Sequence, residues 1–213
     1  MGSVKSIPTK WSEISVGDFI ALTEIQKNNY ETPLDMELDT IALLTNRTLE
    51  EVQLMNIIDL KKEMAKLHFM DTLPAEKLKP CFYMKGKMYD LNLDITKLNG
   101  GQVIDLQHFI NKGGDNPITQ AHNIIACLIS RRKWLLIKGK YQSGLHAEIA
   151  ELVHQHLSMD IAYPYLLFFS KVGASFFPII NDYLELEINR LKKKLMKVIK
   201  KEKAIINGIG IKS

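Results

Sequence analysis

The segment HAEIAELVHQH at 146–156 has residue types that can bind a metal. Glu151 and His154 form an E-x-x-H pair, and this spacing places both side chains on one face of a helix. Carboxylate-bridged dimetal bundles use the pair twice, with two further inward glutamates. The chain has no second E-x-x-H, and His154 and His156 would point to different sides of a helix. We therefore expect no metal and no cofactor. A metal-dependent enzyme centred on Glu151 and His154 remains as an alternative.

Other catalytic or nucleotide-binding patterns are also missing from the sequence. The segment KGKYQSG has no Walker spacing, and no G-x-S-x-G occurs. The two cysteines, Cys81 and Cys127, have no C-x-x-C or zinc-finger spacing. Both lie in apolar surroundings, which favours buried free thiols, with a disulfide as the alternative. We expect the protein not to be an enzyme.

The elements that would position such residues are mainly helical. Apolar residues recur at helical spacing in most of the chain, and Thr48 with Glu51 forms a capping-box signature that opens a short helix. Asp59 is the expected cap of the next helix. Helices are expected in segments that begin near residues 16, 34, 49, 58, 102, 118 and 145.

One segment instead alternates apolar and polar residues. CFYMKGKMYDLNLD, at about 81–94, suits a small β-hairpin with Lys85 and Gly86 at its turn. The expected fold is therefore mainly α, with this hairpin and a long basic C-terminal helix. The expected organisation is a flexible segment at 1–10, a helical body at 11–178, the basic helix at 179–206 and a flexible tail at 207–213.

The basic helix combines an apolar seam with lysine-rich faces. The seam residues step by four and three, as in a heptad repeat: Leu184, Ile188, Leu191, Leu195 and Val198. The electrostatic set is Arg190, Lys192, Lys193, Lys194, Lys197, Lys200 and Lys201. These lysines suit a solvated face, and contact with another protein, with phosphates or with a membrane surface are the alternatives.

The net charge of +4 comes from this end of the chain. Residues 185–213 hold nine Lys or Arg and three acids, whereas residues 1–184 hold 19 and 21. A nucleic-acid-binding domain usually carries its excess positive charge on the fold itself. The distribution therefore favours protein contact through the seam, with any DNA contact weak and secondary.

An aromatic cluster precedes the basic helix. It is expected to serve as core or as an interface, and it consists of Tyr163, Tyr165, Phe168, Phe169, Phe176 and Phe177. No stretch reaches eighteen consecutive apolar residues, and the start lacks a secretory h-region. We expect no membrane association.

The opening WSEISVGDFIALTEI resembles the start of small proteins encoded among the structural genes of tailed bacteriophages, including crAss-like phages. In these proteins a Trp-Ser-Glu-Ile motif leads into a helix that begins near Gly17. Similar segments are IALLTNRTLEEV, YMKGKMYDLNLDITKL, GQVIDLQHF and NIIACLI, so the resemblance covers residues 11–130, with an echo at 146–169. None of these motifs carries catalytic residues.

This resemblance implies a tail-assembly chaperone or a small virion component near the tail or portal. The basic C-terminal helix departs from a minimal chaperone and favours a protein that stays in the particle. We therefore expect a structural or assembly protein, found in the virion or in the host cytoplasm during assembly. Its expected partners are tail, portal or ring components, and a homo-oligomer is possible. A chaperone absent from the mature particle and a nucleic-acid-binding protein are the alternatives.

Overall fold

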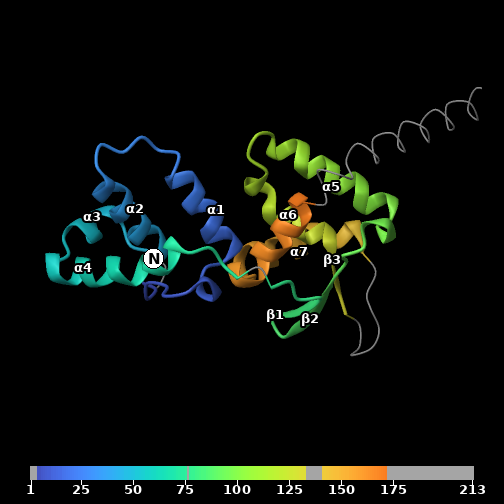
Figure 1. The fold of residues 1–213 in the computed structure, drawn as a ribbon, viewed down its shortest axis with the longest axis horizontal. Coiled ribbons are helices and arrows are strands. Elements are labelled where there is room, and N and C mark those ends of the chain that lie inside the picture. Colours follow the sequence, from blue (N-terminus) through green and yellow to red (C-terminus); the bar gives the residue numbers. More distant parts are fainter. Residues whose placement is uncertain (1–3, 76, 133–140, 172–213) are drawn as a thin grey trace, which may run out of the picture. The chain divides into compact units, whose positions relative to one another are not determined.

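The computed structural model describes residues 4–75, 77–132 and 141–171 (Figure 1). Most of them belong to one compact unit, Met1–Leu167, and the rest belong to a second unit, Phe168–Ser213. The expected basic helix at 179–206 and the tail at 207–213 lie outside the described residues. The description below concerns the first unit unless stated otherwise.

The first part of the chain is helical, as the sequence predicts. Short 3₁₀ segments at Trp11–Glu13 and Leu67–Asp71 flank the helices. The helices are α1 (Val16–Ile25), α2 (Pro33–Thr45), α3 (Leu49–Gln53) and α4 (Ile57–Lys66).

Local side-chain caps explain where these helices begin. Ser15, Thr32 and Thr48 each accept a hydrogen bond from a backbone N–H in the first turn, and an acidic side chain three residues on reciprocates. The box at Thr48 confirms the sequence prediction. For α4 the prediction was wrong. Asn56, rather than Asp59, is the cap, and its side chain accepts from the backbone N–H of Asp59 at 2.9 Å.

A shared apolar core holds α2, α3 and α4 together. It consists of Ile7, Leu38, Ile41, Ala42, Val52 and Leu60. Ile7 belongs to the segment expected to be flexible, and the backbone N–H of the nearby Lys5 donates to the carbonyl of Thr45 at 2.9 Å. The start of the chain therefore helps to close this helical group.

The hairpin is confirmed, but it is part of a larger sheet. Strand β1 (Cys81–Met84) pairs antiparallel with β2 (Lys87–Leu91), and positive φ angles at Lys85 (48°) and Gly86 (69°) form the tight turn. A third strand, β3 (Ile129–Arg131), pairs antiparallel with β2. The sequence does not predict β3, because this strand is short and its partner lies about forty residues away.

The later helices pack near this sheet (Figure 1). They are α5 (Gly100–Gly113), α6 (Ala121–Leu128) and α7 (His146–His156), and a further helix starts at 159 and reaches the end of the described residues at 171. Helix α6 runs directly into β3, and it packs against α5 and α7. Gln102 on α5 is buried, and its amide donates to the carbonyl of Cys127 at 2.8 Å.

Two backbone hydrogen bonds join the start of α1 to the end of α7. Val16 N–H donates to the carbonyl of Leu157 at 2.9 Å, and Met159 N–H donates to the carbonyl of Ile14 at 2.8 Å. They form an isolated antiparallel bridge between Ser15 and Ser158. All four hydrogen-bonded residues are fully buried, so this bridge fixes α1 against α7 in a dry environment.

Candidate functional site

The structure separates the two residues of the E-x-x-H pair. Glu151 is exposed, and it accepts a hydrogen bond from the side-chain amide of Gln155. The ring of His154 lies directly over Gly17 of α1, so closely that a Cβ atom at position 17 would be 2.5 Å from the ring. Among the described residues, no group of three or more His, Cys, Asp or Glu side chains is placed to hold a metal ion.

His154 contacts a second histidine, His122 of α6. Their rings meet edge to face, with 5.1 Å between centroids and 77° between planes. The Nδ1 atom of His122 is buried and has no hydrogen-bond partner in the described structure, and Nε2 lies 3.1 Å from Nδ2 of Asn123. Burial, together with the nearby His154, lowers the pKa of His122 to about 4.

A polar network that the sequence analysis missed joins α5, α6 and α7. Nδ1 of His146 lies 3.1 Å from the hydroxyl of Tyr141 and 3.9 Å from Sγ of Cys127. The Tyr141 hydroxyl donates to the carboxylate of Asp105 at 2.6 Å, and Nε2 of His146 lies 3.3 Å from Oδ1 of Asn123. The ring of Phe109 stacks on His146, with 4.8 Å between centroids.

Cys127, His146 and Asn123 have the order of contacts of a cysteine-nucleophile triad, but their environment prevents that chemistry. Cys127 is fully buried and His146 is nearly so. Burial raises the pKa of the Cys127 thiol to about 12, so the thiol stays protonated near neutral pH. Burial also lowers the pKa of His146, although Asp105 opposes this shift. A nucleophilic thiolate needs both ionisation and access for its substrate, so this network holds the helices together.

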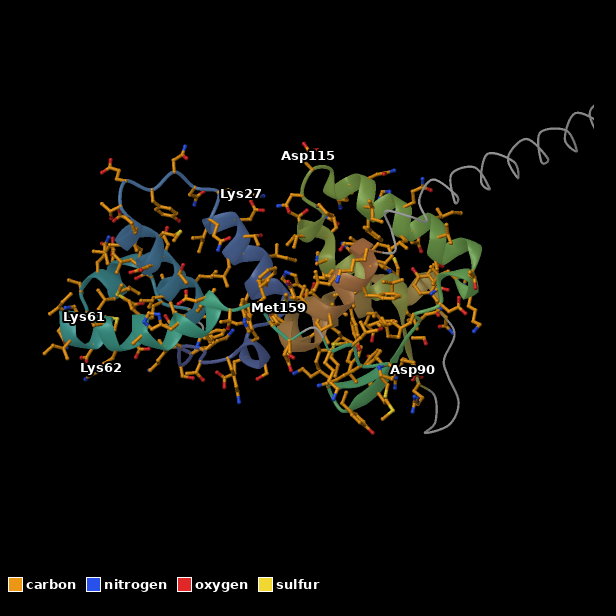
Figure 2. The ribbon with its side chains drawn as sticks, in the orientation of Figure 1. Lys27, Lys61, Lys62, Asp90, Asp115 and Met159 are labelled. Atoms are coloured by element: carbon orange, nitrogen blue, oxygen red, sulfur yellow. The ribbon has the colours of Figure 1, made fainter. Side chains whose placement is uncertain are left out.

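The buried ion pair of the sheet is likewise structural. Asp90 on β2 is almost fully buried, and it accepts two hydrogen bonds from the Arg132 guanidinium, one of them from Nε at 2.9 Å. The bonding to Asp90 raises the pKa of Arg132. Asp90 is labelled in Figure 2, where it lies on the strand next to β3. A bidentate pair of this kind fixes the register between neighbouring strands.

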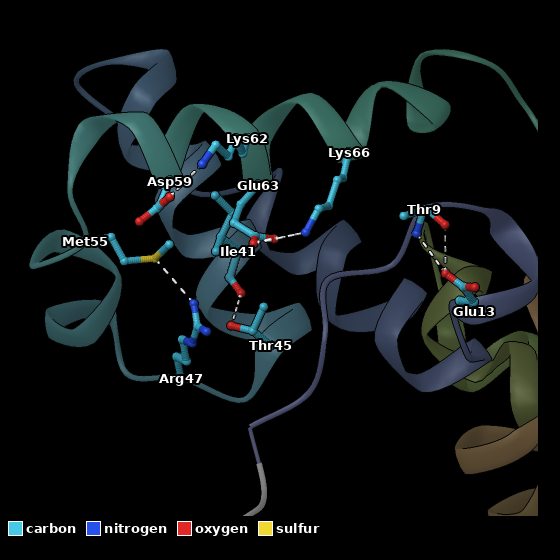
Figure 3. Close-up of polar contacts among 10 residues, drawn as sticks. All are labelled: Thr9, Glu13, Ile41, Thr45, Arg47, Met55, Asp59, Lys62, Glu63 and Lys66. Carbon is cyan, nitrogen blue, oxygen red and sulfur yellow. Dashed lines mark hydrogen bonds and ion pairs between the residues drawn. The ribbon is translucent and has the colours of Figure 1, made fainter.

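The most accessible feature is an apolar corner between α3 and α4. Leu54, Ile57 and Ile58 are 86%, 61% and 64% exposed, and they lie within five positions of the chain. We call these three residues the apolar corner. The intervening Met55 packs inward against the core of α2–α4, and its sulfur accepts from the Arg47 guanidinium at 3.3 Å (Figure 3).

The charged residues beside the apolar corner are largely paired within α4. Lys62 pairs with Asp59 at 3.1 Å, and Lys66 pairs with Glu63 at 3.0 Å (Figure 3). Lys61 and Lys62 point outward from α4 (Figure 2). Contiguous exposed apolar side chains with a polar rim are typical of protein-binding surfaces.

The predicted aromatic cluster divides between two environments. Tyr165 is buried core, with its hydroxyl donating to the carbonyl of Lys79 and its ring 5.8 Å from that of Phe82. Phe169 is buried, whereas Tyr163 and Phe168 are half-buried. Phe176 and Phe177 lie outside the described residues.

The predicted seam and electrostatic set also lie outside the described residues, from Leu184 to Lys201. The structure therefore leaves them as sequence predictions. Cys81 and Cys127 are both free thiols. In the described part of the chain, no helix is long and apolar enough to cross a membrane.

Comparison with known proteins gives no relatives. No protein-family model, curated protein or solved structure matches this chain.

Proposed function

We propose that this chain is a non-enzymatic structural or assembly protein of a tailed bacteriophage. It binds other virion or tail proteins through helical apolar surfaces. The observation that carries the proposal is the apolar corner, where three large side chains within five positions of the chain are exposed, at the end of α3 and the start of α4. The sequence resemblance to small phage structural proteins supplies the phage context, and the seam at 184–198 is a second surface of the same kind.

The buried polar groups support the non-enzymatic part of the proposal. The Cys127–His146 contact lies in the interior, and the Glu151 and His154 side chains face different neighbours. Buried polar networks whose groups are hydrogen-bonded to one another rigidify a core. An interaction surface is therefore the feature of the described residues that best suits a function.

The first test is quantitative mass spectrometry of purified, DNA-filled particles of the phage that encodes this chain. A fixed stoichiometry to the portal protein identifies a virion component. Absence from particles, combined with presence in infected-cell lysate bound to a tail protein, identifies a tail-assembly chaperone. Failure to co-purify with any virion or tail protein contradicts the proposal in both forms.

The apolar corner is tested by substituting Ile57→Ser and Ile58→Ser together. The few residues that anchor an interface cost more than about 1 kcal/mol each when truncated, so we expect at least about tenfold weaker binding to the co-purifying partner if Ile57 and Ile58 are its anchors. Both side chains are largely exposed, so the melting temperature stays close to that of the wild type. Binding is measured by calorimetry.

Ile104→Ser is the matched control for this experiment. Ile104 is 60% exposed on α5, outside the apolar corner, and its substitution should leave affinity unchanged. Equal losses from the control and the double variant would show that the apolar corner is not a specific surface.

The lysine-rich end favours one alternative, a nucleic-acid-binding protein. Nine Lys or Arg lie in residues 185–213, and binding through them would release counterions and weaken steeply with salt. A chain truncated after Tyr183 should then lose its DNA binding. Unchanged DNA binding by the truncated chain would eliminate this alternative.

A further inference from the structure

Three helices meet at two imidazole rings in edge-to-face contact. Helix α1 packs against both α6 and α7, and the contact is closest where the His154 ring lies over Gly17. His154 also meets the edge of His122. We call Gly17, His154 and His122 the histidine stack. It therefore links the start of α1, through α7, to the beginning of α6.

The hydrogen bonding of His122 fits only the neutral ring. Asn123 has its Oδ1 beside Nε2 of His146 at 3.3 Å, and its Nδ2 donates to Oε1 of Gln120 at 2.9 Å. Its Nδ2 therefore faces Nε2 of His122 as a donor, and a neutral ring accepts there. An imidazolium carries N–H at both nitrogens, so its Nε2–H would face another donor. The buried Nδ1 carries the proton of the neutral ring and has no acceptor in the described structure in either state.

The surrounding charges do little to favour a proton on His122. His154 and His146 on α7 and Lys112 on α5 oppose it, and Glu151 on α7 is the acid that favours it. Asp105 on α5 is engaged by Tyr141, next to His146. On the outer side of His154, a pocket of about 350 Å³ has further titratable residues in its lining: Lys5, Asp18 and His156.

We propose that the histidine stack is an acid-sensitive latch that holds α1 against α6 and α7. The latch is closed when His122 is neutral. Protonation of His122 places a cation beside His154 and removes the bond to Asn123, and the rings separate. Because His154 is packed on Gly17, their separation loosens α1 beyond the Ser15–Ser158 bridge, which stays hydrogen-bonded.

The direction of the effect follows from the shifted pKa. The pKa of His122 falls from an ordinary value of 6.5 to about 4 when the protein folds. The stability that neutral His122 contributes is therefore complete above about pH 6.5 and is lost as the pH falls towards 4. Within this window, the equilibrium for opening should rise about tenfold per pH unit.

The test is hydrogen exchange of the full chain from pH 7 to pH 4, corrected for intrinsic rates, with the His122 titration followed by NMR. We expect amides of α1 to lose protection over the interval in which an accessible His122 would take up its proton, while α2–α4 stay protected. If α1 keeps constant protection from pH 6.5 to pH 4, the latch does not exist.

His122→Phe keeps a ring at this position and removes the titration. We expect α1 in this variant to stay protected down to pH 4, and His156→Gln, an exposed histidine of α7, to behave as the wild type. An unchanged acid response in His122→Phe would overturn the proposal. If His122→Phe does not fold, the wild-type protein still tests the latch, because its α1 protection can be compared directly with the titration of His122.

Discussion

Gly17 is the residue whose identity is most tightly fixed by its surroundings. A Cβ atom there would lie 2.5, 2.7 and 2.9 Å from three atoms of the His154 ring, closer than side-chain packing allows. The ring also contacts His122, which restricts its movement. A side chain at position 17 must therefore displace the His154 ring or α1 itself.

We expect Gly17→Ala to destabilise the protein by about 1–3 kcal/mol, the usual cost of overpacking. Chemical denaturation measures this loss. Gly100→Ala is the matched control, because a Cβ atom at Gly100 of α5 meets nothing within 4 Å. Adding His154→Ala should recover part of the loss caused by Gly17→Ala, and additive effects of the two changes would contradict the contact.

At the scale of elements, helix starts depend on side chains next to them in sequence. This is why the sequence could predict most helices and the capping box at Thr48. The cap of α4 was assigned to Asp59 because Asn56 and Asp59 are both good cap residues three positions apart. Only the backbone conformation shows which of them precedes the helix.

Asn56→Ala should destabilise the protein by about 1 kcal/mol, since the N–H of Asp59 loses its acceptor. Asn56→Ser should restore most of this stability, because serine caps α1 in the same way at Ser15. Thermal unfolding of the three proteins gives the comparison. Equal stability of wild type and Asn56→Ala would contradict the assignment of the cap.

The sheet and the histidine contacts could not be predicted from sequence for a different reason. β3 pairs with β2 across forty residues, and Cys127 meets His146 across nineteen. Periodicity reports which face of a helix is apolar, but not which helix covers it. The sequence therefore gives no reason to place His122 beside His154.

At the scale of the whole molecule, the core protects Cys127 from solvent. Cys81 is half-buried on β1, whereas Cys127 is fully buried and its pKa is raised to about 12 by burial. We expect a thiol reagent to modify Cys81 readily in the native protein. Modification of Cys127 requires opening of the core. Its rate should therefore rise with denaturant concentration in parallel with the unfolding equilibrium.

The Cys127→Ala variant assigns the slow phase of this reaction to its thiol. Loss of the slow phase with the fast phase retained is the expected result. Fast modification of Cys127 in native buffer would mean that the thiol is accessible, and would reopen the question of chemistry at His146.

The bridge between Ser15 and Ser158 also matters while the chain is being synthesised. Its two sides are separated by about 140 residues, so α1 leaves the ribosome long before its partner exists. At ordinary translation rates this interval is on the order of ten seconds, during which the start of α1 at Val16 lacks the partner that α7 supplies. The nascent chain therefore has a long period in which a chaperone can bind this part of α1, and this period ends only when residue 159 emerges.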